Sequence, residues 1–198
     1  MKKPIVPITS LSNTDSVDDA TLVLRMKEGD VWAMEAFYHR FVHKITGISA
    51  RLLRNSSDIE DVVQDTFTEA YRDMPQIKSP QLVERWLVRI AVHRAHRRFR
   101  RRKLKRTLGL DRSIDDERLF IQVGVHASHE ARAEIALLDS VFDTMNISER
   151  TCFVLRYIEG YRLEEVAQIT GYSLATVKRR IVNAKGAVDR HFEEESHG

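Results

Sequence analysis

The chain has 198 residues, which is enough for one ordinary domain or two small ones, and its hydrophobic content of 42% excludes a wholly disordered protein. With only 8 Gly and 4 Pro it has few turn residues for an all-β protein. Because the net charge is only +3, the distribution of charge along the chain says more about partners than the total does.

The N-terminal residues 1–16 are predicted to be a flexible leader, because their short apolar run is interrupted and lacks the core of a secretory signal. No window along the chain approaches the ~18 apolar residues that a membrane span needs, so no membrane insertion is expected. A single cysteine, Cys152, excludes an internal disulfide and a cysteine-based zinc site. Its apolar surroundings indicate a reduced core thiol, and we infer a cytoplasmic setting.

Apolar residues recur at three- and four-residue spacing through most of the chain, which predicts an all-α fold. The first four helices are expected at about 18–28, 31–53, 57–74 and 82–105. Four more are expected at 130–145, 149–158, 162–170 and 173–191. The pattern lapses between them, so we predict two small helical domains, residues 17–106 and 130–192, joined by a flexible linker at 107–129.

Local signals refine the helix ends. Ser57 and Glu60 have the spacing of a capping box, in which each side chain satisfies the backbone amide of the other residue. Gly160 and Gly171 lie where helices should end in the left-handed conformation.

The helix at 57–74 is predicted to have an acidic outer face. Residues 58–73 contain six acidic side chains and one basic one, and Asp61, Gln64 and Asp65 lie opposite the apolar stripe. DNA would repel this face, whereas a basic protein surface would attract it. A merely solvated acidic helix is the alternative.

The helix at 82–105 is predicted to be buried on most of its girth and basic on the rest. Nine of the thirteen residues 94–106 are Lys or Arg, and their mutual repulsion would be relieved by nucleic-acid phosphates. The remaining polar stripe holds Arg85, Arg89, His93, His96, Arg97 and Arg100, with Trp86 at its edge. A solvated or membrane-surface basic helix is the alternative. Trp86 is equally suited to stacking on an unpaired base and to core packing.

The segment 162–188 has the features of a helix-turn-helix. Ala167 permits a close helix crossing, Gly171 suits the turn, and Ser173 is placed to cap the second helix. The second helix has an inner stripe of Val177, Ile181, Ala184 and Val188. The residues expected to face DNA are Ser173, Ala175, Thr176, Lys178, Arg179, Arg180, Val182 and Asn183. An ordinary helical hairpin with a solvated basic face is the alternative.

Three motifs in this order and spacing resemble the extracytoplasmic-function (ECF) group of sigma-70-type sigma factors. Asp61-Val62-Val63-Gln64-Asp65-Thr66-Phe67 is similar to the family's polymerase-clamp motif D-x-x-Q-[DE]-x-F. Trp86-Leu87-Val88-Arg89-Ile90-Ala91 is similar to its W-L-x-x-I-A motif in the helix that reads the −10 element. Leu163-Glu164-Glu165-Val166-Ala167 and Thr176-Val177-Lys178 are similar to its −35 reader.

The resemblance implies a promoter-specificity subunit that is not itself an enzyme and needs no cofactor or metal. Its partners would be bacterial core RNA polymerase, through the β′ clamp and the β flap, promoter DNA, and an anti-sigma factor. Asp61, Gln64 and Asp65 would bind the clamp, the stripe of the basic helix would contact the −10 element, and the helix-turn-helix would contact the −35 element. His93, Arg97 and the loop 76–83 depart from the family pattern, so the −10 sequence does not carry over from relatives.

Two other functions compete with this one. A stand-alone helix-turn-helix regulator would leave the acidic face and the basic helix unexplained. A nucleic-acid enzyme would need a reactive or metal-binding constellation, and no H-E-x-x-H pattern is present. His93 and His96 have ligand spacing, but the surrounding arginines would repel a cation.

Overall fold

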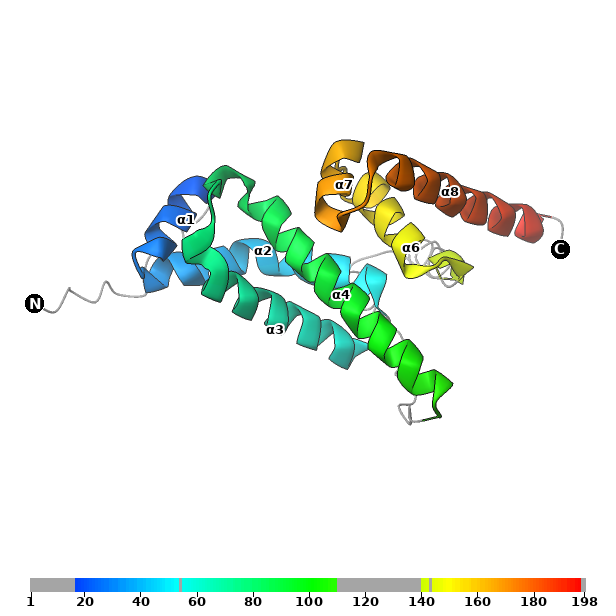
Figure 1. Cartoon of the computed structure of the whole chain (residues 1–198), viewed down its shortest axis with the longest axis horizontal. Helices are drawn as coiled ribbons and strands as arrows, with labels where there is room; N and C mark the ends of the chain where they lie inside the picture. Colours follow the sequence, from blue (N-terminus) through cyan, green and yellow to red (C-terminus); the bar gives the residue numbers. More distant parts are fainter. Residues whose placement is uncertain (1–16, 54, 110–139, 143, 197–198) are drawn as a thin grey trace, which may run out of the picture.

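The computed structural model describes residues 17–53, 55–109, 140–142 and 144–196, with side chains described as far as residue 191 (Figure 1). The described part consists of helices and contains no strand, which confirms the all-α prediction. The predicted leader, most of the predicted linker and most of the helix expected at 130–145 lie outside the described residues.

The N-terminal unit has four helices: α1 (Asp19–Lys27), α2 (Val31–Leu52), α3 (Ser56–Asp73) and α4 (Val83–Thr107). Two short 3-10 turns, η2 (Met74–Gln76) and η3 (Pro80–Leu82), connect α3 to α4. The C-terminal unit has α6 (Ile147–Phe153), which continues into the π-helical turn η5 (Val154–Ile158), followed by α7 (Leu163–Thr170) and α8 (Leu174–Ser196).

The start of α3 differs from the prediction. The helix begins at Ser56, and Asn55 caps it by accepting a hydrogen bond from the Asp58 amide at 3.1 Å. Ser57 therefore lies inside the first turn and the expected capping box with Glu60 is wrong. An Asn two residues earlier is at least as good a cap as Ser, so the helix starts where the stronger acceptor is.

The core of the N-terminal unit is formed by the inner faces of all four helices. Phe37 and Ile45 of α2, Phe67 of α3 and Leu87 of α4 are among its buried members. Each such side chain contributes about 1.5–3 kcal/mol when fully buried. α4 buries residues over a wide arc, as predicted, and beyond the bundle it projects as an exposed basic rod (Figure 1).

The C-terminal unit folds as a helix-turn-helix, as predicted. Gly171 ends α7 with φ 74°, and the Ser173 hydroxyl accepts from the Thr176 amide at 3.2 Å at the start of α8. Val177, Ile181 and Ala184 are buried against α6 and α7. Gly160 also takes a positive φ of 77° before α7.

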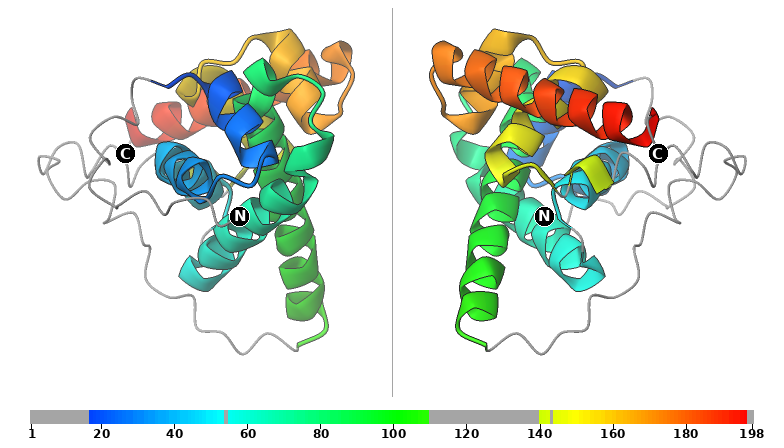
Figure 2. Two further views of the ribbon diagram at one scale, coloured as in Figure 1. Left: turned by 90° about the vertical axis from the view of Figure 1, so that its left-hand side faces the viewer. Right: turned by 90° about the vertical axis from the view of Figure 1, so that its right-hand side faces the viewer.

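The two units lie against each other, which the sequence did not predict. α7 packs on α4, and α6 contacts both α4 and α2 (Figures 1 and 2). The contact covers part of the helix from which the sequence predicts promoter contacts.

Candidate protein and nucleic-acid interfaces

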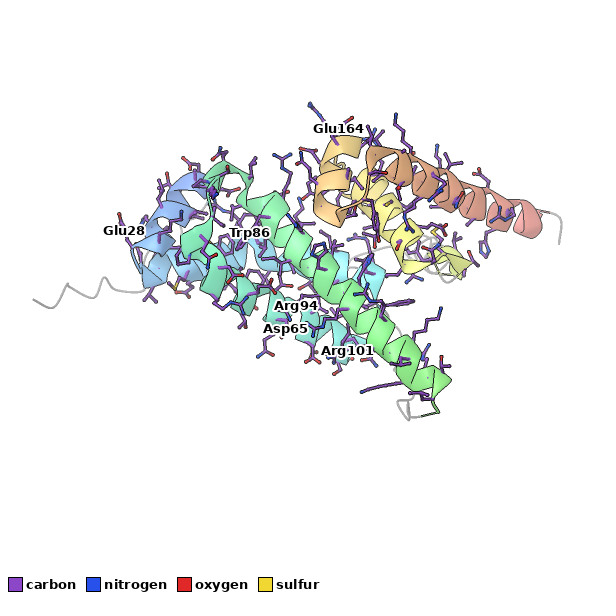
Figure 3. All side chains as sticks on the ribbon, viewed as in Figure 1. Glu28, Asp65, Trp86, Arg94, Arg101 and Glu164 are labelled. Carbon is purple, nitrogen blue, oxygen red and sulfur yellow. The ribbon has the colours of Figure 1, made fainter. Side chains whose placement is uncertain are left out.

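The acidic face of α3 is exposed, but it is not a free row of carboxylates. Gln64 and Asp65 are exposed and Asp61 is half-buried. Arg98 of α4 donates to Asp61, and Arg94 lies 3.3 Å from an oxygen of Asp65. Figure 3 shows Asp65 and Arg94 side by side where α3 and α4 run together.

Three arginines, spaced one helical turn apart on α4, face the acids of α3. Arg94 donates to Glu69 through Nε at 2.7 Å, and Arg98 donates to Asp58 through Nε at 2.5 Å. Arg102 also reaches Asp58, at 3.0 Å. These pairs offset much of the negative charge of α3 but only part of the positive charge of α4, and they hold the two helices in register.

The polar residues of α4 that the sequence predicts to contact the promoter fall into two groups, which differ in exposure. Arg89, His93, Arg97 and Arg100 are exposed, and the structure gives none of the three arginines an ion pair with a described acid. These four side chains remain available to a ligand. Arg97 also lines a recess of about 250 Å³ between α3 and α4, next to Asp61 and Asp65.

His96 and Arg85 belong to the second group, and their placement corrects the predicted stripe. His96 is only 8% exposed and its Nε2 is 2.7 Å from the Thr151 hydroxyl of α6. Arg85 donates to Glu165 of α7 at 2.7 Å. In this arrangement both side chains contact the C-terminal unit, because the packing of α6 and α7 covers this flank of α4.

The two histidines of α4 are uncharged at neutral pH. Burial lowers the pKa of His96 to about 4, and the nearby charges of Arg100 and Arg180 act in the same direction. Partial desolvation, Arg89 and Arg100 also lower the pKa of His93, against the opposing effect of Glu69. His93 therefore offers one ring donor and one ring acceptor, without a positive charge for phosphate.

Trp86 is half-buried and lines two recesses. The first has a volume of about 450 Å³ and lies beside the turns between α3 and α4. Its lining residues are Asp73, Gln76, Ile77, Lys78, Ser79, Leu82 and Trp86. Lys27 of α1 donates to the Ile77 carbonyl at 2.6 Å and so ties the wall of this recess to the bundle.

The second recess, of about 300 Å³, lies between α3 and the middle of α4. Its lining residues are Glu69, Trp86, Arg89, Ile90 and His93. The predicted promoter contacts include Trp86, Arg89 and His93 but not Glu69, which counts in the sequence only as one of the six acids of residues 58–73. Helical spacing alone does not show which of these acids lies beside α4.

The outer face of α8 is arranged as predicted. Ser173, Ala175, Lys178, Arg179, Val182 and Asn183 are exposed, and Thr176 is half-buried. Asn183 also donates to Glu149 of α6 at 3.0 Å. Arg180 differs from its neighbours, because its guanidinium stacks over the Tyr172 ring with a centroid distance of 4.5 Å. Arg180 therefore supports the turn as well as adding charge.

Glu84, at the start of α4, joins both units. It accepts from Lys44 of α2 and from the Tyr161 hydroxyl, both at 2.6 Å. Burial opposes its charged form, but the two hydrogen bonds, together with the positive charges of Lys44 and Arg85, outweigh burial and lower the pKa of Glu84. No sequence pattern indicates this contact, since the three residues are far apart along the chain.

Comparison with known proteins identifies both units. Residues 37–105 match the family model for sigma-70 region 2, and residues 135–188 match the model for sigma-70 region 4. The ECF RNA polymerase sigma-E factor of Haemophilus influenzae is 30% identical over 187 residues, which cover 90% of this chain and 97% of that protein. The chain belongs to the ECF group of the sigma-70 family of sigma factors.

Other relatives agree with this assignment. The RNA polymerase sigma-H factor of Pseudomonas aeruginosa is 30% identical over 184 residues, covering 88% of this sigma factor and 94% of that one. Sigma factors regulate transcription and are not catalysts. The match to region 2 as well as region 4 does not favour a stand-alone helix-turn-helix regulator.

Solved structures share the fold. RpoE of Bartonella quintana, in complex with the anti-sigma factor NepR, aligns with a TM-score of 0.67 and 16% identity, covering 80% of this sigma factor and 96% of that chain. CnrH, in complex with the cytosolic domain of CnrY, aligns with a TM-score of 0.65 and 21% identity. The alignment covers 89% of this sigma factor and 97% of the CnrH chain. Within the described ranges, no helix of this sigma factor is long and apolar enough to span a membrane.

Proposed function

We propose that this sigma factor binds core RNA polymerase through α3 and contacts promoter DNA through two separate faces, one on α4 and one on α8. The observation that carries the proposal is the exposure, in one chain, of the outer residues of α8 and of Arg89, His93, Arg97 and Arg100 on α4, while the apolar inner faces of both helices are buried. Such a chain would act in the cytoplasm, with the bacterial transcription machinery.

The polymerase contact would be made by Asp61, Gln64 and Asp65. All three lie on the outer side of α3, where the side chains of Asp61 and Asp65 are 47% and 58% exposed. A basic partner surface such as the β′ clamp would compete with Arg94 and Arg98 for these carboxylates. Exposed ion pairs contribute little to stability, so such an exchange costs little.

The −10 contact would be made by the exposed part of the α4 stripe, namely Arg89, His93, Arg97 and Arg100, together with Trp86. The larger recess beside Trp86 would accept an unpaired base, with the indole as a stacking surface. Arg85 and His96 would join this interface only after the C-terminal unit moves away from them.

The −35 contact would be made by α8 in the major groove. A recognition helix of this kind presents its N-terminal residues to base edges. Arg179 is exposed at that end and can donate two hydrogen bonds to a guanine, while Lys178 is placed for phosphate.

Run-off transcription with purified core polymerase tests the proposal. Asp61→Lys combined with Asp65→Lys is expected to lower promoter-dependent transcripts at least tenfold, because two lysines repel a basic clamp. Glu28→Lys combined with Glu35→Lys makes the same charge change at exposed sites outside α3, one just after α1 and one on α2, and should transcribe normally. Equal activity of the two double variants would show that α3 is not the docking face.

Gel shifts with and without core polymerase separate a sigma factor from an independent DNA-binding protein. Promoter binding by the chain alone should be weak, since each DNA face is small. Tight and sequence-specific binding without polymerase would contradict the proposal.

A further inference from the structure

We propose that the recess between α3 and α4 is a phosphate site for the backbone of the promoter strand, and that Asp61 and Asp65 block it until polymerase binds them. This inference rests on the proposed function, in which those two carboxylates contact the clamp. It adds Arg94, Arg98 and Arg101, which are not among the predicted promoter contacts, and it links two binding events through shared side chains.

The recess has the charge of an anion site. Its volume is about 250 Å³, and all but one of its lining residues are charged. Arginines of α4 outnumber the aspartates of α3 around it, and Figure 3 shows Arg94 and Arg101 on the part of α4 that runs beside α3. Guanidinium groups bind phosphate through paired, charge-assisted hydrogen bonds. The arginines are Arg94, Arg97, Arg98 and Arg101, and the aspartates are Asp61 and Asp65.

Arg94 is held by two acids that differ in burial. Its Nε donates to Glu69 at 2.7 Å, whereas it reaches Asp65 only through a terminal nitrogen, at 3.3 Å. The side chain of Glu69 is 26% exposed and that of Asp65 is 58% exposed. The more buried acid therefore orients the guanidinium, and the outer one occupies a terminal nitrogen.

Arg98 repeats this arrangement one turn further along α4. Its Nε donates to Asp58 at 2.5 Å, and a terminal nitrogen donates to Asp61. Asp58 is again the more buried acid of the two. Neither Asp58 nor Glu69 lines the recess, whereas both outer aspartates do. Loss of the outer aspartates would therefore leave two terminal nitrogens facing the recess, on guanidinium groups that the inner acids still orient.

Arg97 and Arg101 supply the charge that is available at all times. Both are exposed, and the structure gives neither of them an ion pair with a described acid. They are four residues apart on α4, which separates them by about 6 Å along the helix axis, so one extended strand can contact both. Because Arg97 also belongs to the face proposed for the −10 element, the phosphates that reach this recess are those of the promoter strand.

The shared arginines couple polymerase binding to DNA binding. A basic clamp that pairs with Asp61 and Asp65 releases the terminal nitrogens of Arg94 and Arg98, and a phosphate that binds those nitrogens releases the aspartates. Each ligand therefore strengthens the binding of the other, and by linkage the two effects are equal. Exposed ion pairs are weak, so neither exchange is costly.

The free chain tests the site without polymerase. Asp61→Asn combined with Asp65→Asn removes the outer carboxylates, and the affinity of this variant for a labelled single-stranded oligonucleotide is measured over a series of salt concentrations. It should bind about tenfold more tightly than the wild type at low salt. The slope of log affinity against log salt should steepen by about 1.4, since each of two added phosphate contacts contributes about 0.7. An oligonucleotide that lacks bases should show the same gain.

Glu28→Gln combined with Glu60→Gln is the matched control. It removes the same charge from exposed side chains that do not line the recess, so its salt slope should equal that of the wild type. This control separates the loss of two particular carboxylates from a general change in net charge.

A double-mutant cycle assigns the gain to the shared arginines. Arg94→Gln combined with Arg98→Gln should lower the oligonucleotide affinity about tenfold more in the asparagine variant than in the wild type, because only there do the terminal nitrogens face an open recess. Thermal unfolding midpoints show which chains fold. A misfolded pair is replaced by Arg98→Lys, which keeps the charge but cannot donate to Asp58 and to a phosphate together, and which should lose part of the gain.

The outcomes separate this inference from the proposed function. Equal salt slopes of the wild type and the asparagine variant, a control that gains as much, or a gain that requires bases would overturn the phosphate site. None of these results would affect the polymerase contact, which run-off transcription tests through Asp61→Lys with Asp65→Lys. Normal transcription by that lysine variant would overturn the proposed docking face, and with it the coupling to polymerase.

Discussion

A side chain on α4 gains or loses a role according to what packs beside it. His96 and Arg97 are neighbours in the same basic run, yet one is buried against Thr151 and the other is exposed. Their charges differ as well, since burial keeps His96 neutral. The sequence shows that this run is basic, but the helices packed against α4 determine which of its side chains are exposed and can contact DNA.

His96 makes the stability of the structure in which the two units are packed together depend on pH. Its pKa is about 4 in the structure and 6.5 when exposed, so the exposed form takes up a proton first as the pH falls. The contribution is complete above pH 6.5 and is lost progressively toward pH 4. Between pH 7.5 and 5.0 the free energy of unfolding should fall by about 2 kcal/mol from this residue.

Urea unfolding at the two pH values measures this effect. His96→Gln can still form a hydrogen bond with Thr151 but does not titrate, so it should lose about 2 kcal/mol less than the wild type over the same interval. An identical pH dependence of the two chains would show that His96 is exposed in solution.

At the scale of elements, the turn between α7 and α8 sets the orientation of α8, the helix proposed to contact the −35 element. Gly171 has φ 74° with open space around its α-carbon, so only the backbone conformation requires glycine there. The Ser173 cap then starts α8 in the direction that buries Val177 and exposes Arg179.

Replacing this glycine should destabilise the C-terminal unit. Gly171→Ala is expected to cost about 1–2 kcal/mol of unfolding free energy, the penalty of the left-handed conformation for an L-residue. Gly186→Ala in α8 is the control with the opposite sign, because its Cβ would make only an ordinary 3.5 Å contact and alanine favours a helix by about 0.5–1 kcal/mol. Urea denaturation of both variants checks this pair, and a stable Gly171→Ala chain would mean that the turn relaxes.

At the scale of the whole molecule, the two units are joined by polar contacts that also occupy part of the DNA-binding helix. Arg85 pairs with Glu165, Arg51 with Glu159, and His96 with Thr151. Such contacts exchange readily with water or with another partner. We therefore expect the units to separate when polymerase and promoter bind both of them.

Energy transfer between dyes attached to the two units would measure this separation. Val31→Cys and Arg190→Cys place labels at exposed sites on α2 and α8, and Cys152 should stay unlabelled because it is buried with its thiol pKa raised to about 11. Transfer should drop when core polymerase and promoter DNA are added. A pair within one unit, Val31→Cys with Thr107→Cys, should not change, and constant transfer in both pairs during active transcription would exclude the opening.

Among the described residues, the sequence by itself determined the helices apart from the start of α3, the division into two units, and the inward and outward faces of α3 and α8. These follow from local periodicity, glycine and cap residues, which act over a few positions of the chain. It also indicated the polymerase and promoter faces, through motifs that are continuous in sequence.

Only the tertiary structure decided which side chains of those faces remain free. The pairing of Arg94 with Glu69 joins two helices, and the pairings of Glu84 with Tyr161 and of His96 with Thr151 join two units. Such contacts depend on how helices far apart in the chain cross, and helical periodicity does not encode the crossing.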